Sequence, residues 1–87
     1  MSFTGMDIAE VQRLGSQLHA AANDLRTLAN NLTTALANTS WVGPDRMRFE
    51  QDWQSMHATQ INHVAEALEA AGQNANLNAQ QQSEASQ

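Results

Sequence analysis

Apolar residues follow a regular helical pattern in the first half of the chain. They alternate steps of three and four residues through four heptads, at Val11, Leu14, Leu18, Ala21, Leu25, Leu28, Leu32 and Ala35. This spacing corresponds to the a and d positions of a coiled-coil heptad and places one apolar stripe along a helix. The adjoining e positions are also small or apolar, at Ile8, Gly15, Ala22, Ala29 and Leu36. The stripe is therefore wide enough to contact two neighbouring helices, and its small residues allow another helix to approach closely.

A second helix is predicted from Pro44 to about Ala71. Its apolar positions are Met47, Phe49, Trp53, Met56, Ile61, Val64, Ala67, Leu68 and Ala71. The steps of four between Phe49 and Ile61 later give way to alternating steps of three and four. This change indicates a drift of the apolar stripe near His57, similar to a stutter in a coiled coil.

Capping residues predict the ends of both helices. The first helix is expected over about residues 5–37, with Thr4 as its N-cap and Phe3 and Ile8 as a hydrophobic staple, or with a later start at Asp7. The turn over about residues 38–43 ends in Gly43, a suitable cap for a helix that begins with Pro44. A connection this short makes the two helices antiparallel neighbours.

The end of the second helix is predicted at Gly72, in the position where glycine commonly terminates helices. Residues 73–87 are rich in glutamine and asparagine, and Leu77 is their only large apolar residue. This composition predicts a flexible polar tail that is disordered or weakly helical. The predicted domain is thus a helical hairpin over residues 1–72.

The predicted fold class is all-α, an antiparallel two-helix hairpin that pairs into a four-helix-bundle dimer. A lone hairpin has a thin core, this chain has no cysteine to reinforce it, and its first apolar stripe is too wide for one neighbour. Pairing of two hairpins buries the remaining stripe. The residues expected in the bundle core and partner interface are Val11, Leu14, Leu18, Leu25, Leu28, Leu32, Phe49, Trp53, Ile61, Val64 and Leu68.

Composition and charge exclude several functional classes. Fifteen alanines and eight leucines among 87 residues favour helix over sheet. The absence of cysteine excludes disulfides, thiolate zinc sites and a cysteine nucleophile. The net charge of −5, with no lysine, argues against a nucleic-acid partner. No apolar run is long enough for a membrane span, and residues 1–10 lack the features of a secretory signal peptide.

Candidate catalytic chemistry is sparse. His57 and His63 are six residues apart, which places them on different helix faces, and His19 stands alone. Neither arrangement provides the paired histidines of a helical zinc motif. The nearby carboxylates Glu50 and Asp52 diverge around the helix, and the sequence contains no nucleophile elbow or phosphate-binding glycine loop. We therefore expect no catalytic residue, no cofactor, no metal and no small-molecule substrate.

Trp41 is the most unusual residue of the connection. A tryptophan at a hairpin turn serves either as an exposed anchor for a partner or as a plug over the end of the hairpin. Both roles are open at this point. Trp41 also begins the tripeptide Trp41-Val42-Gly43, which lies near mid-chain between two helical segments and is followed by the aromatic residues Phe49 and Trp53.

This layout resembles the WXG family of type VII secretion substrates, the early-secreted-antigen-like proteins, over roughly residues 4–75. The resemblance implies a helical hairpin that pairs with a second family member as a four-helix bundle. It implies cytoplasmic synthesis, followed by export in folded form by the ATPase-driven secretion machine of a Gram-positive bacterium. In this family Trp41 and Gly43 would belong to the turn recognised during secretion. Family members act as secreted effectors or as partners that escort other substrates.

One departure from the family pattern concerns the tail. Many exported members carry Tyr-x-x-x-Asp/Glu after the second helix, whereas this chain has no tyrosine and places Gln80 at that spacing before Glu84. The resemblance therefore favours a heterodimer whose partner supplies the tail signal, with a homodimer as the second possibility. A cytosolic adaptor that chaperones a larger toxin through a similar hairpin is the alternative function.

Overall fold

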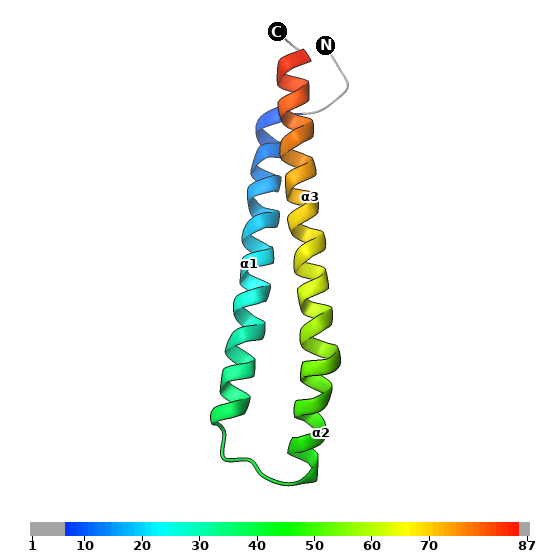
Figure 1. The fold of residues 1–87 in the computed structure, drawn as a ribbon. Coiled ribbons are helices and arrows are strands. Elements are labelled where there is room, and N and C mark those ends of the chain that lie inside the picture. Colours follow the sequence, from blue (N-terminus) through cyan, green and yellow to red (C-terminus); the bar gives the residue numbers. More distant parts are fainter. Residues whose placement is uncertain (1–6, 86–87) are drawn as a thin grey trace.

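The computed structural model describes residues 7–85, which form a long antiparallel helical hairpin (Figure 1). One arm is helix α1, Ile8–Asn38. The other arm comprises α2, Pro44–Asp52, one turn of π-helix, Trp53–His57, and α3, Ala58–Ala85. The hairpin measures 64 × 17 × 15 Å, and within residues 7–85 it is a single layer of two helical arms. The predicted all-α hairpin is confirmed for the described residues.

Helix α1 begins after Asp7, which is its N-cap. The Asp7 carboxylate accepts a hydrogen bond from the backbone N–H of Glu10 at 3.1 Å and so satisfies one of the free donors of the first turn. The structure thus has the later of the two predicted starts. The predicted cap at Thr4 and the staple through Phe3 lie outside the described residues.

The connection over residues 39–43 lies where the sequence predicts it. Gly43 caps α2 with φ of 123°, a left-handed backbone conformation that favours glycine, and Pro44 occupies the first helical position. Arg46 fixes this connection to the end of α1. Its guanidinium donates hydrogen bonds to the carbonyl oxygens of Leu36 at 2.9 Å and Trp41 at 3.1 Å, and its Nε lies 2.8 Å from the Glu50 carboxylate. This role of Arg46 was not predicted from the sequence.

A π-helical turn interrupts the second arm near His57, where the sequence predicts an irregularity. The backbone N–H of Ala58 donates to the carbonyl of Trp53, five residues earlier, instead of to a carbonyl four residues earlier. The extra residue rotates the preceding part of the arm by about one residue position, or about 100°. Trp53 consequently faces α1, where it is buried and its Nε1 donates to the Thr33 hydroxyl at 2.7 Å.

Small residues form the seam between the two arms. Gly15, Ala22 and Ala29 are the buried residues of α1, and Ala65, Gly72 and Ala79 are those of α3. Each set repeats every seven residues, which keeps it on one side of its helix. The backbones approach so closely that a Cβ atom on Gly72 would lie 2.9 Å from the carbonyl oxygen of Gly15.

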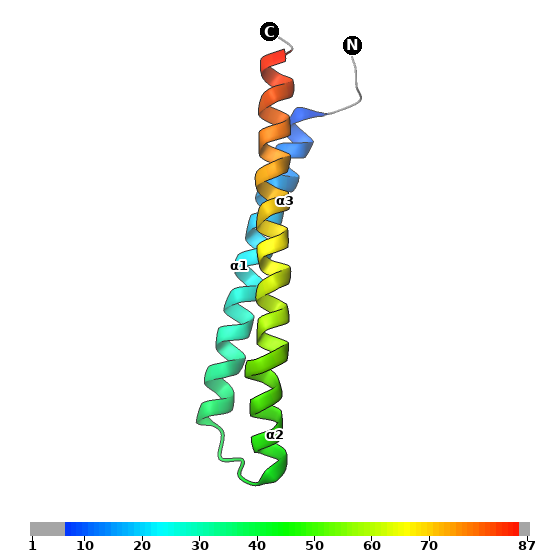
Figure 2. The same ribbon diagram turned by 45° about the vertical axis from the view of Figure 1, so that its right-hand side comes forward.

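The second arm extends beyond its predicted end. Helix α3 passes through Gly72 and continues to Ala85, so the predicted helix end at residue 71 and the flexible tail over residues 73–87 are corrected for the described residues 73–85. The physical reason is that Gly72 provides close contact with α1 instead of terminating the helix, and Ala79 extends the same seam. Figures 1 and 2 both show α3 running past the start of α1 at the open end.

Candidate interaction surface

The seam of small residues leaves most of the large aliphatic side chains of both arms on one side of the hairpin. We call this surface the leucine face; it comprises Val11, Leu14, Leu18, Leu25, Leu28 and Leu32 of α1 with Ile61, Val64 and Leu68 of α3. Helical spacing sets each group beside its own buried seam residues. The two groups lie side by side: Leu25 of α1 lines the same hollow as Ile61 and Val64 of α3.

The side chains of the leucine face are incompletely buried by the hairpin. Leu14 retains 49% of its exposed surface and Val64 retains 52%, and Leu28 and Leu32 are similarly exposed. Leu18, Leu25, Ile61 and Leu68 are half-buried. Contiguous apolar surface of this kind on a small protein is typical of an interaction site. Nine of the eleven residues predicted for the bundle core and interface thus share one open surface.

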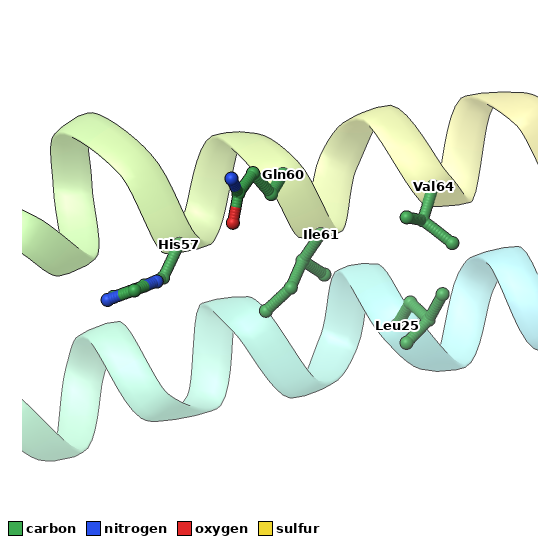
Figure 3. A pocket seen from close by; sticks show the side chains of 5 residues that line it. All are labelled: Leu25, His57, Gln60, Ile61 and Val64. Atoms are coloured by element: carbon green, nitrogen blue, oxygen red, sulfur yellow. The ribbon is translucent and has the colours of Figure 1, made fainter.

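A hollow of about 310 Å³ interrupts the leucine face. Leu25 lies on its α1 side, and His57, Gln60, Ile61 and Val64 line it from the other arm (Figure 3). The hollow begins at the end of the π-turn, where His57 forms part of its wall. Its lining is mainly aliphatic, so it suits a large apolar side chain with polar groups available at one rim.

Polar residues occupy the other side of the seam. Arg26, one turn after the buried Ala22, donates a hydrogen bond from Nη1 to the carboxylate of Glu69 at 2.9 Å. This hydrogen bond and the positive charge of Arg26 lower the pKa of Glu69 below its ordinary value of 4.5. Towards the open end, the amides of Gln12, Asn76 and Gln80 line a polar hollow. The hairpin therefore has one apolar and one polar side.

The connection carries a second group of exposed apolar residues at the tip of the hairpin. Trp41 packs against Phe49 with ring centroids 6.2 Å apart and ring planes inclined by 53°. Trp41 remains 40% exposed and Val42 86% exposed. Trp41 thus covers Phe49 with part of its ring and presents the rest to solvent. The two remaining predicted interface residues differ from the rest, since Phe49 lies at this tip and Trp53 is buried within the hairpin itself.

Two further properties concern residues 7–85 alone. In this range no three or more histidine, aspartate or glutamate side chains gather in a way that suits a metal ion. Within the same range no helix combines the length and apolar character required to cross a membrane. The histidines at positions 19, 57 and 63 are distributed along the two arms.

Comparisons with protein-family models, with curated proteins and with solved structures give no match for this chain.

Proposed function

We propose that this chain is a small secreted interaction protein, a substrate or co-secreted partner of a type VII secretion system in a Gram-positive bacterium. In this proposal it is made in the cytoplasm and exported as a folded helical dimer. The proposal rests on the resemblance of Trp41-Val42-Gly43 and its flanking helices to the WXG family. It is supported by the hairpin architecture and by the open leucine face.

The observation that carries the proposal is the backbone conformation and side-chain exposure of the tripeptide in the connection. Gly43 adopts a backbone conformation that favours glycine, and Trp41 is a partly exposed aromatic side chain at the tip of the hairpin. Exposed tryptophan is a frequent anchor of protein interfaces. Gly43 thus has a conformational role in the connection, and Trp41 is the residue that we propose the secretion ATPase recognises.

We propose a second WXG-family protein as the partner and favour a heterodimer. At the position of the family's tail tyrosine this chain has Gln80, which is exposed on α3 one turn before the exposed Glu84. An amide cannot replace the large ring of tyrosine as an anchor. A partner that carries the tyrosine would complete a composite recognition surface together with Trp41.

Export from a bacterium with a type VII system tests this function. The chain is co-expressed with a small helical protein encoded beside it, and the culture medium and cells are assayed for the wild type, Trp41→Ala and Trp41→Phe. We expect the wild type in the medium only when the secretion ATPase is functional. Trp41→Ala should remain in the cells at normal abundance and helicity, and Trp41→Phe should be exported in part because it retains an aromatic ring.

Normal export of Trp41→Ala would contradict the recognition role of Trp41 and leave it as a plug against Phe49. Export of the wild type without the secretion ATPase would contradict the whole proposal. Retention of the wild type in the cell, bound to a larger protein with a similar hairpin, would instead favour the adaptor function.

A further inference from the structure

We infer that Arg46 is a positioning residue, which holds the connection so that Trp41 is presented for recognition. We call Arg46 together with its ion-pair partner Glu50 the arginine clamp. The inference rests on the proposed function of Trp41 and deepens it by naming the group that controls the same site. Its structural part is measurable without any export.

The connection has little support of its own at the closed end of the hairpin (Figure 1). Within residues 7–85, the backbone groups of Ser40, Trp41 and Val42 form no hydrogen bond with another backbone group. Among the described residues 44–52 of α2 none is buried, so core packing does not fix the tip. A hollow of about 170 Å³ also lies between the last turns of α1 and the start of the second arm. A segment without such contacts is mobile unless a side chain holds it.

Arg46 supplies these contacts. Its Nη2 donates a hydrogen bond to the carbonyl oxygen of Leu36 at 2.9 Å, and its Nη1 donates to the carbonyl oxygen of Trp41 at 3.1 Å. Its Nε lies 2.8 Å from the Glu50 carboxylate, which orients the guanidinium. The Arg46 side chain is only 21% exposed, so water competes less for these contacts than at an open surface. One planar group thus joins α1, the connection and α2.

The charge of Arg46 serves the end of α1 and not its own helix. Arg46 is the third residue of α2, where the helix dipole disfavours a positive charge. The end of α1 favours a cation, and the last turn of α1 contains no basic residue. The Leu36 carbonyl belongs to that turn, where carbonyl groups lack partners within the helix. Arg46 therefore caps α1 from another element, while Glu50 offsets the charge within α2.

The arginine clamp fixes Trp41 through its main chain. Arg46 holds the Trp41 carbonyl, and Phe49 supports the Trp41 ring at a centroid distance of 6.2 Å. A partner then has less to order when it binds the ring, so less of the interaction free energy is lost. Lysine at position 46 would keep the charge but would lack the planar fork that reaches two carbonyl oxygens at once.

Nitrogen-15 NMR relaxation of the full chain tests the arginine clamp, with circular dichroism on the same samples. The wild type, Arg46→Lys, Arg46→Gln and Arg48→Gln are compared. Arg48 is exposed on the same helix, and Arg48→Gln removes the same charge as Arg46→Gln, so it is the matched control. The order parameters of the backbone N–H groups of Trp41 and Val42 report the fast motion of the connection.

We expect these order parameters to be about 0.85 in the wild type and in Arg48→Gln, and below about 0.6 in both Arg46 variants at unchanged helicity. The indole N–H of Trp53, which donates to Thr33, should stay rigid in all four proteins and serves as an internal reference. In the export assay used for Trp41→Ala, both Arg46 variants should be exported about tenfold less than the wild type, because a loosened anchor binds more weakly. Arg48→Gln should be exported normally.

Equal order parameters in the wild type and both Arg46 variants would overturn the inference. So would a mobile connection in the wild type, or normal export of a variant whose connection is mobile. If the Arg46 variants lose helicity, Glu50→Gln removes only the ion pair and must still lower the order parameter of Trp41. A wild type that is never exported would contradict the export proposal, and the order parameters would then decide the arginine clamp alone.

Discussion

Gly72 shows how one residue type supports two opposite interpretations. In the sequence it lies between an apolar stripe and a polar segment, which is the usual place for a glycine that ends a helix. In the structure it lies inside α3, opposite Gly15, where absence of a side chain lets the two backbones meet. One sequence signal did indicate that the helix continues through Gly72. Ala65, Gly72 and Ala79 are spaced by seven residues, as are Gly15, Ala22 and Ala29.

Replacement of Gly72 by alanine tests this role. At an ordinary helix position this change stabilises by up to about 1 kcal/mol. Here the new Cβ would lie 2.9 Å from the Gly15 carbonyl oxygen, so the helices must separate. Such overpacking costs about 1–3 kcal/mol, and we expect a net loss of stability in chemical denaturation.

Gly15→Ala is the matched comparison for Gly72→Ala. Its Cβ would chiefly meet the side-chain amide of Asn76, which can rotate away, and the nearest backbone atom would be 3.1 Å distant. We therefore expect a smaller loss than for Gly72→Ala. A Gly72→Ala protein that is more stable than the wild type would show that the glycine is not needed for close packing.

Elements were predictable from sequence where the periodicity was regular. The heptads of α1 and the Gly43-Pro44 restart gave the first helix and the connection, and the steps of four from Phe49 to Ile61 located the irregular turn. The continuation of α3 to Ala85 was missed because its last turns contain many amides and few apolar side chains. The contacts of Arg46 with Leu36 and Trp41 depend on tertiary geometry and have no local sequence signal.

The π-turn compensates for one extra residue in the second arm. Deletion of Ser55 should convert this turn into regular α-helix while Trp53 still faces Thr33 and the leucine face stays aligned, because five residues of π-helix and four of α-helix rotate the chain by similar angles. We expect cooperative thermal unfolding and a buried-type Trp53 emission spectrum, measured in a Trp41→Phe background.

Deletion of Glu66 provides the control for this experiment. Glu66 lies in the regular part of α3, so its removal turns the preceding residues by about 100° and moves Ala65 out of register with Gly72. We expect this variant to lose cooperative unfolding. Equal damage from both deletions would contradict the interpretation of the π-turn as a tolerated insertion.

At the scale of the whole molecule, the small residues between the two arms determine where the large residues lie. Because the arms contact each other through glycine and alanine, their leucines stay partly exposed and can contact another surface. The apolar stripe was visible in the sequence, but its division between an internal seam and an open face depended on which residues the second arm contacts. The tip adds Trp41 and Val42 as a separate exposed group.

Hydroxyl-radical footprinting of the protein at micromolar concentration tests most directly whether the leucine face is covered. Leu28 and Leu77 provide a matched pair, since they are 49% and 51% exposed in the hairpin alone. They differ in orientation: Leu77 lies two residues before the buried Ala79 and therefore points away from α1. We predict that Leu28 and Leu14 are protected from oxidation relative to Leu77, and that dilution to the monomer removes the protection. Equal oxidation of Leu28 and Leu77 at all concentrations, both alone and with the co-expressed partner, would contradict the account.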